Sequence, residues 1–98
     1  MLGAALSAAL LARAAPALHE VSIRDMRFDP AELRIRVGDS VRWTNHEKRT
    51  SHSVLFPGLE SERLLPDESW QRRFDAPGRF PYACGPHPEM QGLVIVEA

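Results

Sequence analysis

The stretch GRFPYACGPHPEMQGLVIVE, residues 78–97, combines two strand-like segments with a short loop between them. Residues 79–84 carry the aromatic side chains Phe80 and Tyr82 at alternate positions, which is typical of a strand with one face in a core. The run from Leu93 to Val96 is apolar at every position, as in a central strand that is covered on both faces. The sequence therefore predicts two strands that leave their connecting loop at one end of a β-structure.

The loop between these strands carries three side chains that bind soft or borderline metal ions. Cys84 is the only cysteine of the chain, and His87 and Met90 follow it at intervals of three residues. A thiolate, an imidazole and a thioether together suit copper, which alternates between soft Cu(I) and harder Cu(II). We interpret this loop as part of a copper site whose second imidazole ligand comes from another segment of the chain.

The remainder of the chain also reads as short strands separated by turn signals. ELRIRV (32–37) and SVRWTN (40–45) alternate between apolar and polar residues, and 70–74 forms a further short strand before the Ala76-Pro77-Gly78 turn. The stretch 59–69 is polar and irregular. Short strands without a long helical period predict an all-β fold, an antiparallel sandwich or a small barrel.

A sandwich gathers its end loops, so segments far apart in the sequence meet there. The region 45–53 and the loop 84–90 both follow strands, and we expect them to lie together. Three histidines are available as the missing imidazole: His52, His46 and His19. The spacing alone does not choose among them.

The N-terminus resembles an export leader. Residues 2–15 are almost entirely Ala and Leu, too short an apolar run for a membrane-spanning helix of about 20 residues. Ala15-Pro16-Ala17 fits a cleavage pattern, and Ala12-Arg13-Ala14 is an alternative. We predict a leader at 1–17 and a single domain at 18–98, exported and not stably inserted in a membrane once the leader is removed. The competing interpretation is an uncleaved N-terminal helix or anchor.

The composition argues against a nucleic-acid-binding protein. The net charge is −1 and charged residues make up 26% of the chain, without the concentrated basic face that nucleic-acid binding requires. A lone cysteine cannot form an internal disulfide, whereas a metal ion would both occupy the thiol and stabilise a small domain.

Two segments, WTNHEKRTSHSVLF (43–56) and the opening stretch, resemble the cupredoxins, and among them the amicyanin and plastocyanin-like group. The resemblance includes the Pro-His-Pro core around His87. It implies a Greek-key β-sandwich of about seven or eight strands and a type 1 blue-copper site. The implied ligands of one Cu(I)/Cu(II) ion are His52, Cys84, His87 and Met90.

The same resemblance implies a periplasmic carrier of single electrons. Its redox partners would be proteins such as a c-type cytochrome or a periplasmic dehydrogenase, and it would act as a monomer. Four ligands leave no open coordination position, and no nucleophile–base pair lies near the motif, so we do not expect an enzyme. The alternative is a periplasmic copper carrier or buffer without an electron-transfer role.

Some residues have less specialised interpretations. We expect His46 and His19 to be solvated, and Trp43 and Trp70 to lie in the core. Gly85 stands where many cupredoxins carry Thr or Ser, whose hydroxyl ties the ligand loop to the residue after the first histidine, here Ser53. We therefore expect any such tie in this chain to use the backbone of Gly85.

Overall fold

The computed structural model describes residues 15–98. The predicted leader lies outside the described residues except for its last three positions. Within the described part of the chain, no helix is long and apolar enough to cross a membrane.

Nine strands build the described part of the chain. They are β1 (Leu18–Arg24), β2 (Arg27–Asp29), β3 (Glu32–Arg36), β4 (Ser40–Asn45), β5 (Leu55–Phe56), β6 (Leu59–Glu60), β7 (Ser69–Arg73), β8 (Gly78–Ala83) and β9 (Gln91–Glu97).

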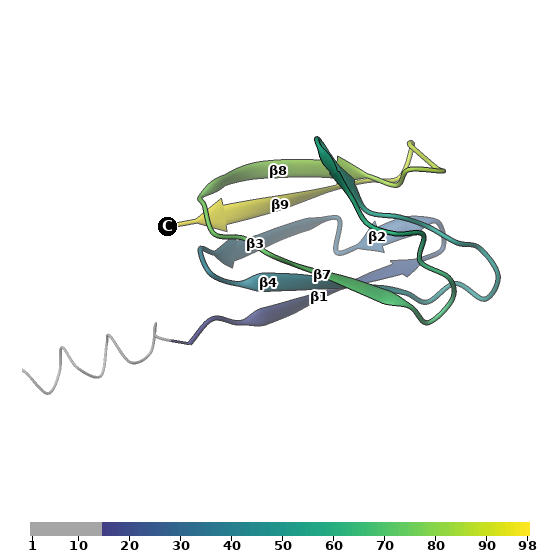
Figure 1. Ribbon diagram of the computed structural model, residues 1–98, viewed down its shortest axis with the longest axis horizontal. Coiled ribbons are helices and arrows are strands. Elements are labelled where there is room, and N and C mark those ends of the chain that lie inside the picture. The colour runs from purple at the N-terminus through teal and green to yellow at the C-terminus, as the bar shows by residue number, and fades with distance from the viewer. Residues whose placement is uncertain (1–14) are drawn as a thin grey trace, which may run out of the picture.

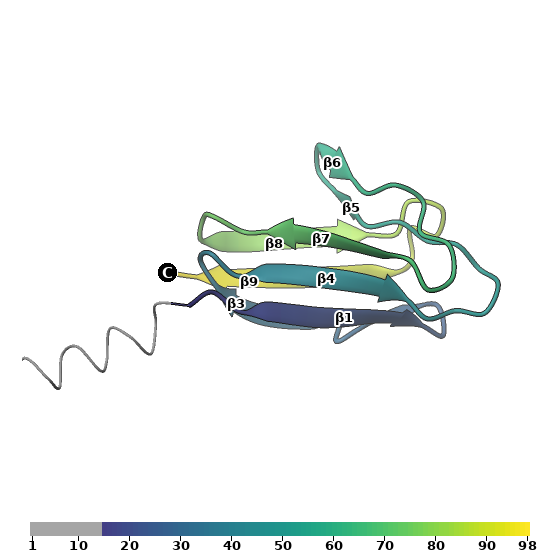
Figure 2. The same cartoon turned by 60° about the horizontal axis from the view of Figure 1, so that its bottom comes forward.

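The strands form two sheets that pack face to face as a sandwich (Figures 1 and 2). One sheet has the order β2-β1-β4-β7 and the other has the order β3-β9-β8-β5-β6. The predicted all-β sandwich is confirmed. As predicted from its continuous apolar run, β9 lies inside its sheet, between β3 and β8.

Two strand pairs depart from the antiparallel pairing that was expected. β1 pairs parallel with β4, and β3 pairs parallel with β9. After β2 the chain crosses to the other sheet as β3 and returns as β4, which therefore runs in the same direction as β1. Such crossings between sheets are typical of Greek-key connections.

Alternating side chains of both sheets fill the space between them. Five core side chains are each no more than 1% exposed: Val21 and Ile23 of β1, Val41 and Trp43 of β4, and Val94 of β9. The core position predicted for Trp43 is thus confirmed, while its cross-strand neighbour Trp70 is half-buried. The sandwich is held together mainly by burial of this apolar surface.

At the end of the sandwich away from the β8–β9 loop, Asp39 fastens the start of β1 to the β3–β4 turn. Its carboxylate accepts hydrogen bonds from Ala17 N–H at 2.8 Å and Arg36 N–H at 3.1 Å, and lies 2.9 Å from His19 Nε2. His19 is therefore hydrogen-bonded and only partly exposed, unlike the solvated residue that was expected. Burial alone would raise the pKa of Asp39, but these hydrogen bonds together lower it.

We expect Asp39→Asn to destabilise the fold at neutral pH and to matter little in strong acid. Because the folded-state pKa is lowered, the unfolded chain takes up the proton first, near its ordinary value of about 3.9. The stabilisation is present above that pH and is lost as the pH falls through the folded-state value. Urea unfolding of the wild type and of Asp39→Asn from pH 7 to pH 2 measures the difference between their free energies of unfolding. A difference that stayed constant over this pH range would contradict this account.

Candidate metal centre

The β8–β9 loop is a tight turn closed by its own backbone. Cys84 follows β8 directly, and its N–H donates to Met90 O at 3.0 Å. Met90 N–H donates in turn to His87 O at 2.9 Å. Pro86 and Pro88 restrict the backbone on both sides of His87. The loop therefore holds its three candidate ligands at fixed positions relative to one another.

The second segment of the site is anchored by a backbone bridge that the sequence did not reveal. His52 and Leu64 exchange N–H···O hydrogen bonds of 3.1 and 2.7 Å. The fully buried Asn45 supports the bridge, since its Nδ2 donates to Thr50 O and Leu64 O, both at 2.9 Å. The stretch 59–69, expected to be irregular, thus supplies both a strand and the support for His52.

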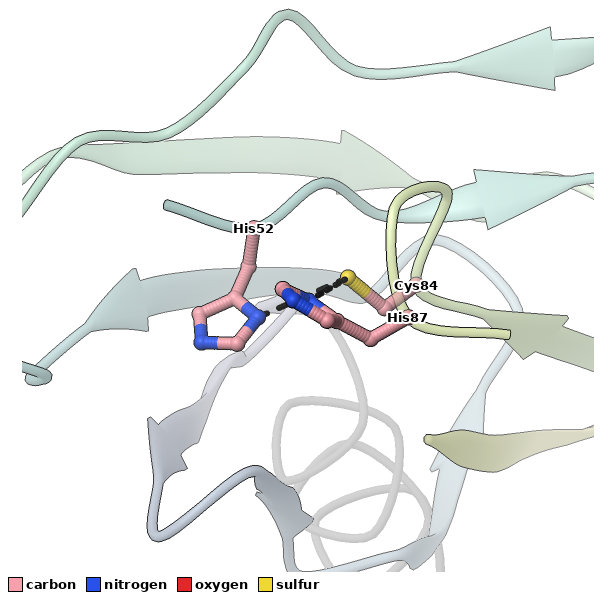
Figure 3. Close-up of side chains that lie close together, drawn as sticks. All are labelled: His52, Cys84 and His87. Atoms are coloured by element: carbon pink, nitrogen blue, oxygen red, sulfur yellow. Dashed lines mark hydrogen bonds between the residues drawn. The ribbon is translucent and has the colours of Figure 1, made fainter. Parts of the chain in front are cut away.

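Three side chains converge at this end of the sandwich (Figure 3). Cys84 Sγ lies 3.5 Å from His52 Nδ1 and 3.7 Å from His87 Nδ1. The donor atoms of the three residues all lie within 4.8 Å of one another. The expected meeting of the region 45–53 with the loop 84–90 is confirmed.

These distances fit donors that share one metal ion. A nitrogen about 2.0 Å and a sulfur about 2.3 Å from a metal are about 3.7 Å apart when their bonds open by about 120°. The two sulfur–nitrogen distances of 3.5 and 3.7 Å agree with that arrangement. Two imidazoles and a thiolate are the trigonal donors of a blue-copper site. The residues present therefore fit copper.

The other candidate ligands separate into two groups. Met90 is buried on the same loop, 3% exposed, and its place as the weak axial ligand stays a prediction. His46 is exposed, as expected, and neither it nor His19 belongs to the cluster of donor atoms. Of the three histidines that the sequence left open, His52 is the one that the structure places in the cluster of donor atoms.

Glu47 contacts the site, and the sequence reasoning did not predict this contact. Its Oε1 lies 3.2 Å from His52 Nε2 and 2.9 Å from Met26 N. The hydrogen bond from Met26 N–H lowers the pKa of Glu47, and the contact with His52 lowers it further, although partial burial acts in the opposite direction. Burial lowers the pKa of His52, although Glu47 opposes this effect. A neutral His52 therefore donates Nε2–H to Glu47 and leaves the Nδ1 lone pair facing Cys84.

We expect Glu47→Ala to weaken copper binding about 10- to 100-fold, the usual effect of removing a carboxylate that orients a histidine ligand. Competition with a chelator of known affinity measures the loss. His46→Ala is the matched control, because it changes an exposed side chain next to Glu47 and should leave the affinity unchanged. Equal affinities for the two variants would contradict the orienting role.

The tie between the two ligand segments uses the backbone of Gly85, as expected. Gly85 N–H donates to Ser53 Oγ at 3.0 Å. Ser53 N–H points at Cys84 Sγ from 3.5 Å, so Ser53 contacts both the sulfur and the loop that carries it. A hydrogen bond to a ligating sulfur is one of the means by which proteins adjust a redox site.

Comparison with known proteins gives consistent matches. The family model of the cupredoxin-like domain matches residues 1–96. Amicyanin-alpha of Methylorubrum extorquens is 41% identical over 85 residues, which cover 80% of this chain and 71% of that protein. Amicyanin of Paracoccus denitrificans is 33% identical over 84 residues, 79% of this chain and 63% of that protein.

Solved structures agree with the sequence matches. A Cu(I) structure of one amicyanin variant has a TM-score of 0.78 to this chain at 32% identity, and an oxidised structure of another has a TM-score of 0.79 at 32% identity. Each match covers 82% of both chains.

Proposed function

This chain belongs to the cupredoxin-like family, and we propose that it carries single electrons through one copper ion held by His52, Cys84, His87 and Met90. The observation that supports this proposal most directly is the convergence of two imidazole nitrogens and the only thiol within 4.8 Å. The relatives named amicyanin, at up to 41% identity over most of the chain, support the same role.

The chain supplies a donor set that suits both oxidation states of copper. A copper ion held by these residues would supply one-electron chemistry between Cu(I) and Cu(II), and the mixed sulfur and nitrogen donors would suit either state. His52 and Cys84 are both fully buried, and the backbone of the loop is closed on itself. A site that is fixed in this way moves little when an electron arrives, so the cost of reorganisation stays small.

His87 is the proposed route of the electron to a partner. It is half-buried between the exposed Pro86 and Pro88, whereas the other two residues of the cluster are buried. A small surface of this kind suits brief docking, because redox encounters bury little area. The proposed partners are a c-type cytochrome or a periplasmic dehydrogenase, and the proposed state between encounters is a monomer.

Spectroscopy and voltammetry of the copper-loaded protein test the electron-carrier role. We expect one Cu(II) per chain, an intense visible thiolate-to-copper absorption and a reversible one-electron wave. Stable copper binding without a reversible wave would favour the carrier or buffer instead, and a colourless protein that binds no copper would overturn both functions.

We propose export with removal of the leader, and the fold favours a cut after Ala14 over one after Ala17. Ala17 N–H donates to Asp39, and Ala17 O accepts from Ser40 N–H at 3.0 Å. A cut after Ala17 removes that residue and both of these contacts, while a cut after Ala14 retains them. Mass spectrometry of the protein from a bacterial periplasm measures the N-terminus. A mature chain beginning at Leu18 would contradict the preferred position, and an intact leader would contradict processing.

A further inference from the structure

We propose that Glu60 is a positioning residue for the ligand loop, acting through Ser53 on the backbone of Gly85. The role is an extension of the proposed copper site, since this loop carries three of the four proposed ligands. Glu60 lies 24 to 30 positions before them in the sequence and has no donor atom in the metal cluster.

The short β5–β6 hairpin brings Glu60 to the site. Phe56 pairs with Leu59 across the two turn residues Pro57 and Gly58, and Gly58 adopts the positive φ of 76° that such a turn requires. The next pair joins Leu55 to Glu60, and Leu55 also pairs with Ala83 of β8. Glu60 therefore lies two strands from the residue that precedes Cys84.

A chain of two hydrogen bonds links Glu60 to the ligand loop. Ser53 Oγ donates to Glu60 Oε2 at 2.8 Å, and Gly85 N–H donates to Ser53 Oγ at 3.0 Å. An ionised carboxylate only accepts, so it directs the Ser53 hydroxyl proton toward itself. The lone pairs of Ser53 Oγ are then free to accept from Gly85. Hydrogen bonds in such a chain polarise and strengthen one another.

The space around Gly85 supports the same assignment. A Cβ atom on Gly85 would lie 2.2 Å from Glu60 Oε2 and 2.6 Å from Ser53 Oγ, both too close for any real side chain. The absence of a side chain at Gly85 is thus what allows the Glu60 carboxylate to reach Ser53. Glu60 and Gly85 act as a matched pair: the carboxylate occupies the place that a side chain at 85 would fill.

The first experiment measures amide hydrogen exchange at Gly85 in the metal-free protein. We expect Glu60→Ala to raise the exchange rate roughly tenfold, the effect of losing about one hydrogen bond. Glu60→Gln keeps an acceptor oxygen and should restore most of the protection. Glu62→Ala, which removes another exposed glutamate from the same segment, should leave the rate unchanged. An unchanged rate in Glu60→Ala, or the same rise in Glu62→Ala, would overturn the proposal.

A double-mutant cycle tests the shared space. Gly85→Ala should lower the unfolding midpoint in urea in the wild-type background and lower it much less in Glu60→Ala, where Ser53 is free to turn away. Additive shifts would contradict the matched pair.

The copper-loaded proteins supply a third measurement. Glu60→Ala should change the cupric paramagnetic spectrum and Glu60→Gln should restore it. An identical spectrum in all three proteins would overturn the positioning role, whereas failure of the wild type to bind copper would overturn only the proposed function, because the exchange and unfolding measurements need no metal.

Discussion

We expect Cys84→Ser to abolish the intense visible absorption of the copper-loaded protein. The band requires charge transfer from a thiolate sulfur, and no other cysteine is available in the chain. Serine is nearly the same size as cysteine, but its hydroxyl is a hard donor that stays protonated at neutral pH. Titration with Cu(II) under an absorption spectrometer measures the loss, which should be complete.

Two controls separate this effect from unfolding. Cys84 is fully buried, so the metal-free variant is first compared with the wild type by urea unfolding, where we expect a difference of about 1 kcal/mol or less for so small a change. His46→Ala should keep the full absorption, because His46 lies outside the cluster. Retention of the band in Cys84→Ser would mean that the thiol does not bind the metal.

The proximity of Cys84 and His87 could be predicted from the sequence because their relation is local. Cys84 and His87 lie three positions apart on a loop bounded by strands, so little can separate them. His52 required more: it followed from the family resemblance and from the need for a second imidazole. The structure then selected it over His46 by placing its Nδ1 3.5 Å from Cys84 Sγ.

The residues that support the ligands were not predictable in the same way, because their roles depend on tertiary pairing. Glu47 and Glu60 read as ordinary polar loop residues. The loop after β4 brings Glu47 to His52, and the β5–β6 hairpin brings Glu60 to Ser53. No rule of local periodicity assigns such a carboxylate its partner.

The limits of periodicity also appear in the sandwich itself. The alternation of Leu33, Ile35 and Val37 predicted three residues on one buried face, yet only Ile35 is fully buried and Val37 is 40% exposed. β3 ends at Arg36, and Val37 already belongs to the turn at Gly38. Alternation identifies a strand, but the point where the chain leaves the sheet decides the burial of its last residue.

We expect Trp43→Ala to cost about 3–5 kcal/mol in the free energy of unfolding, the usual range for removing a fully buried large aromatic side chain. Trp43 is completely buried between the sheets, with its ring centroid 5.4 Å from that of Tyr82 and 5.9 Å from that of Phe56. Small domains are stable by only about 5–15 kcal/mol, so the metal-free variant should be close to its unfolding midpoint at 37 °C.

Trp70→Ala is the matched control for this prediction, because the same side chain is removed from the position paired with Trp43 across β4 and β7. Trp70 is only half-buried, so its loss leaves a smaller cavity and should cost roughly half as much or less. Urea unfolding of both metal-free variants compares the two costs. Copper should then raise the stability of Trp43→Ala, since an ion that binds only the folded chain shifts the equilibrium toward it. Equal costs for the two tryptophans would mean that the core is not centred on Trp43. If copper did not raise the stability of Trp43→Ala, the ligands would fail to assemble in the absence of the Trp43 side chain.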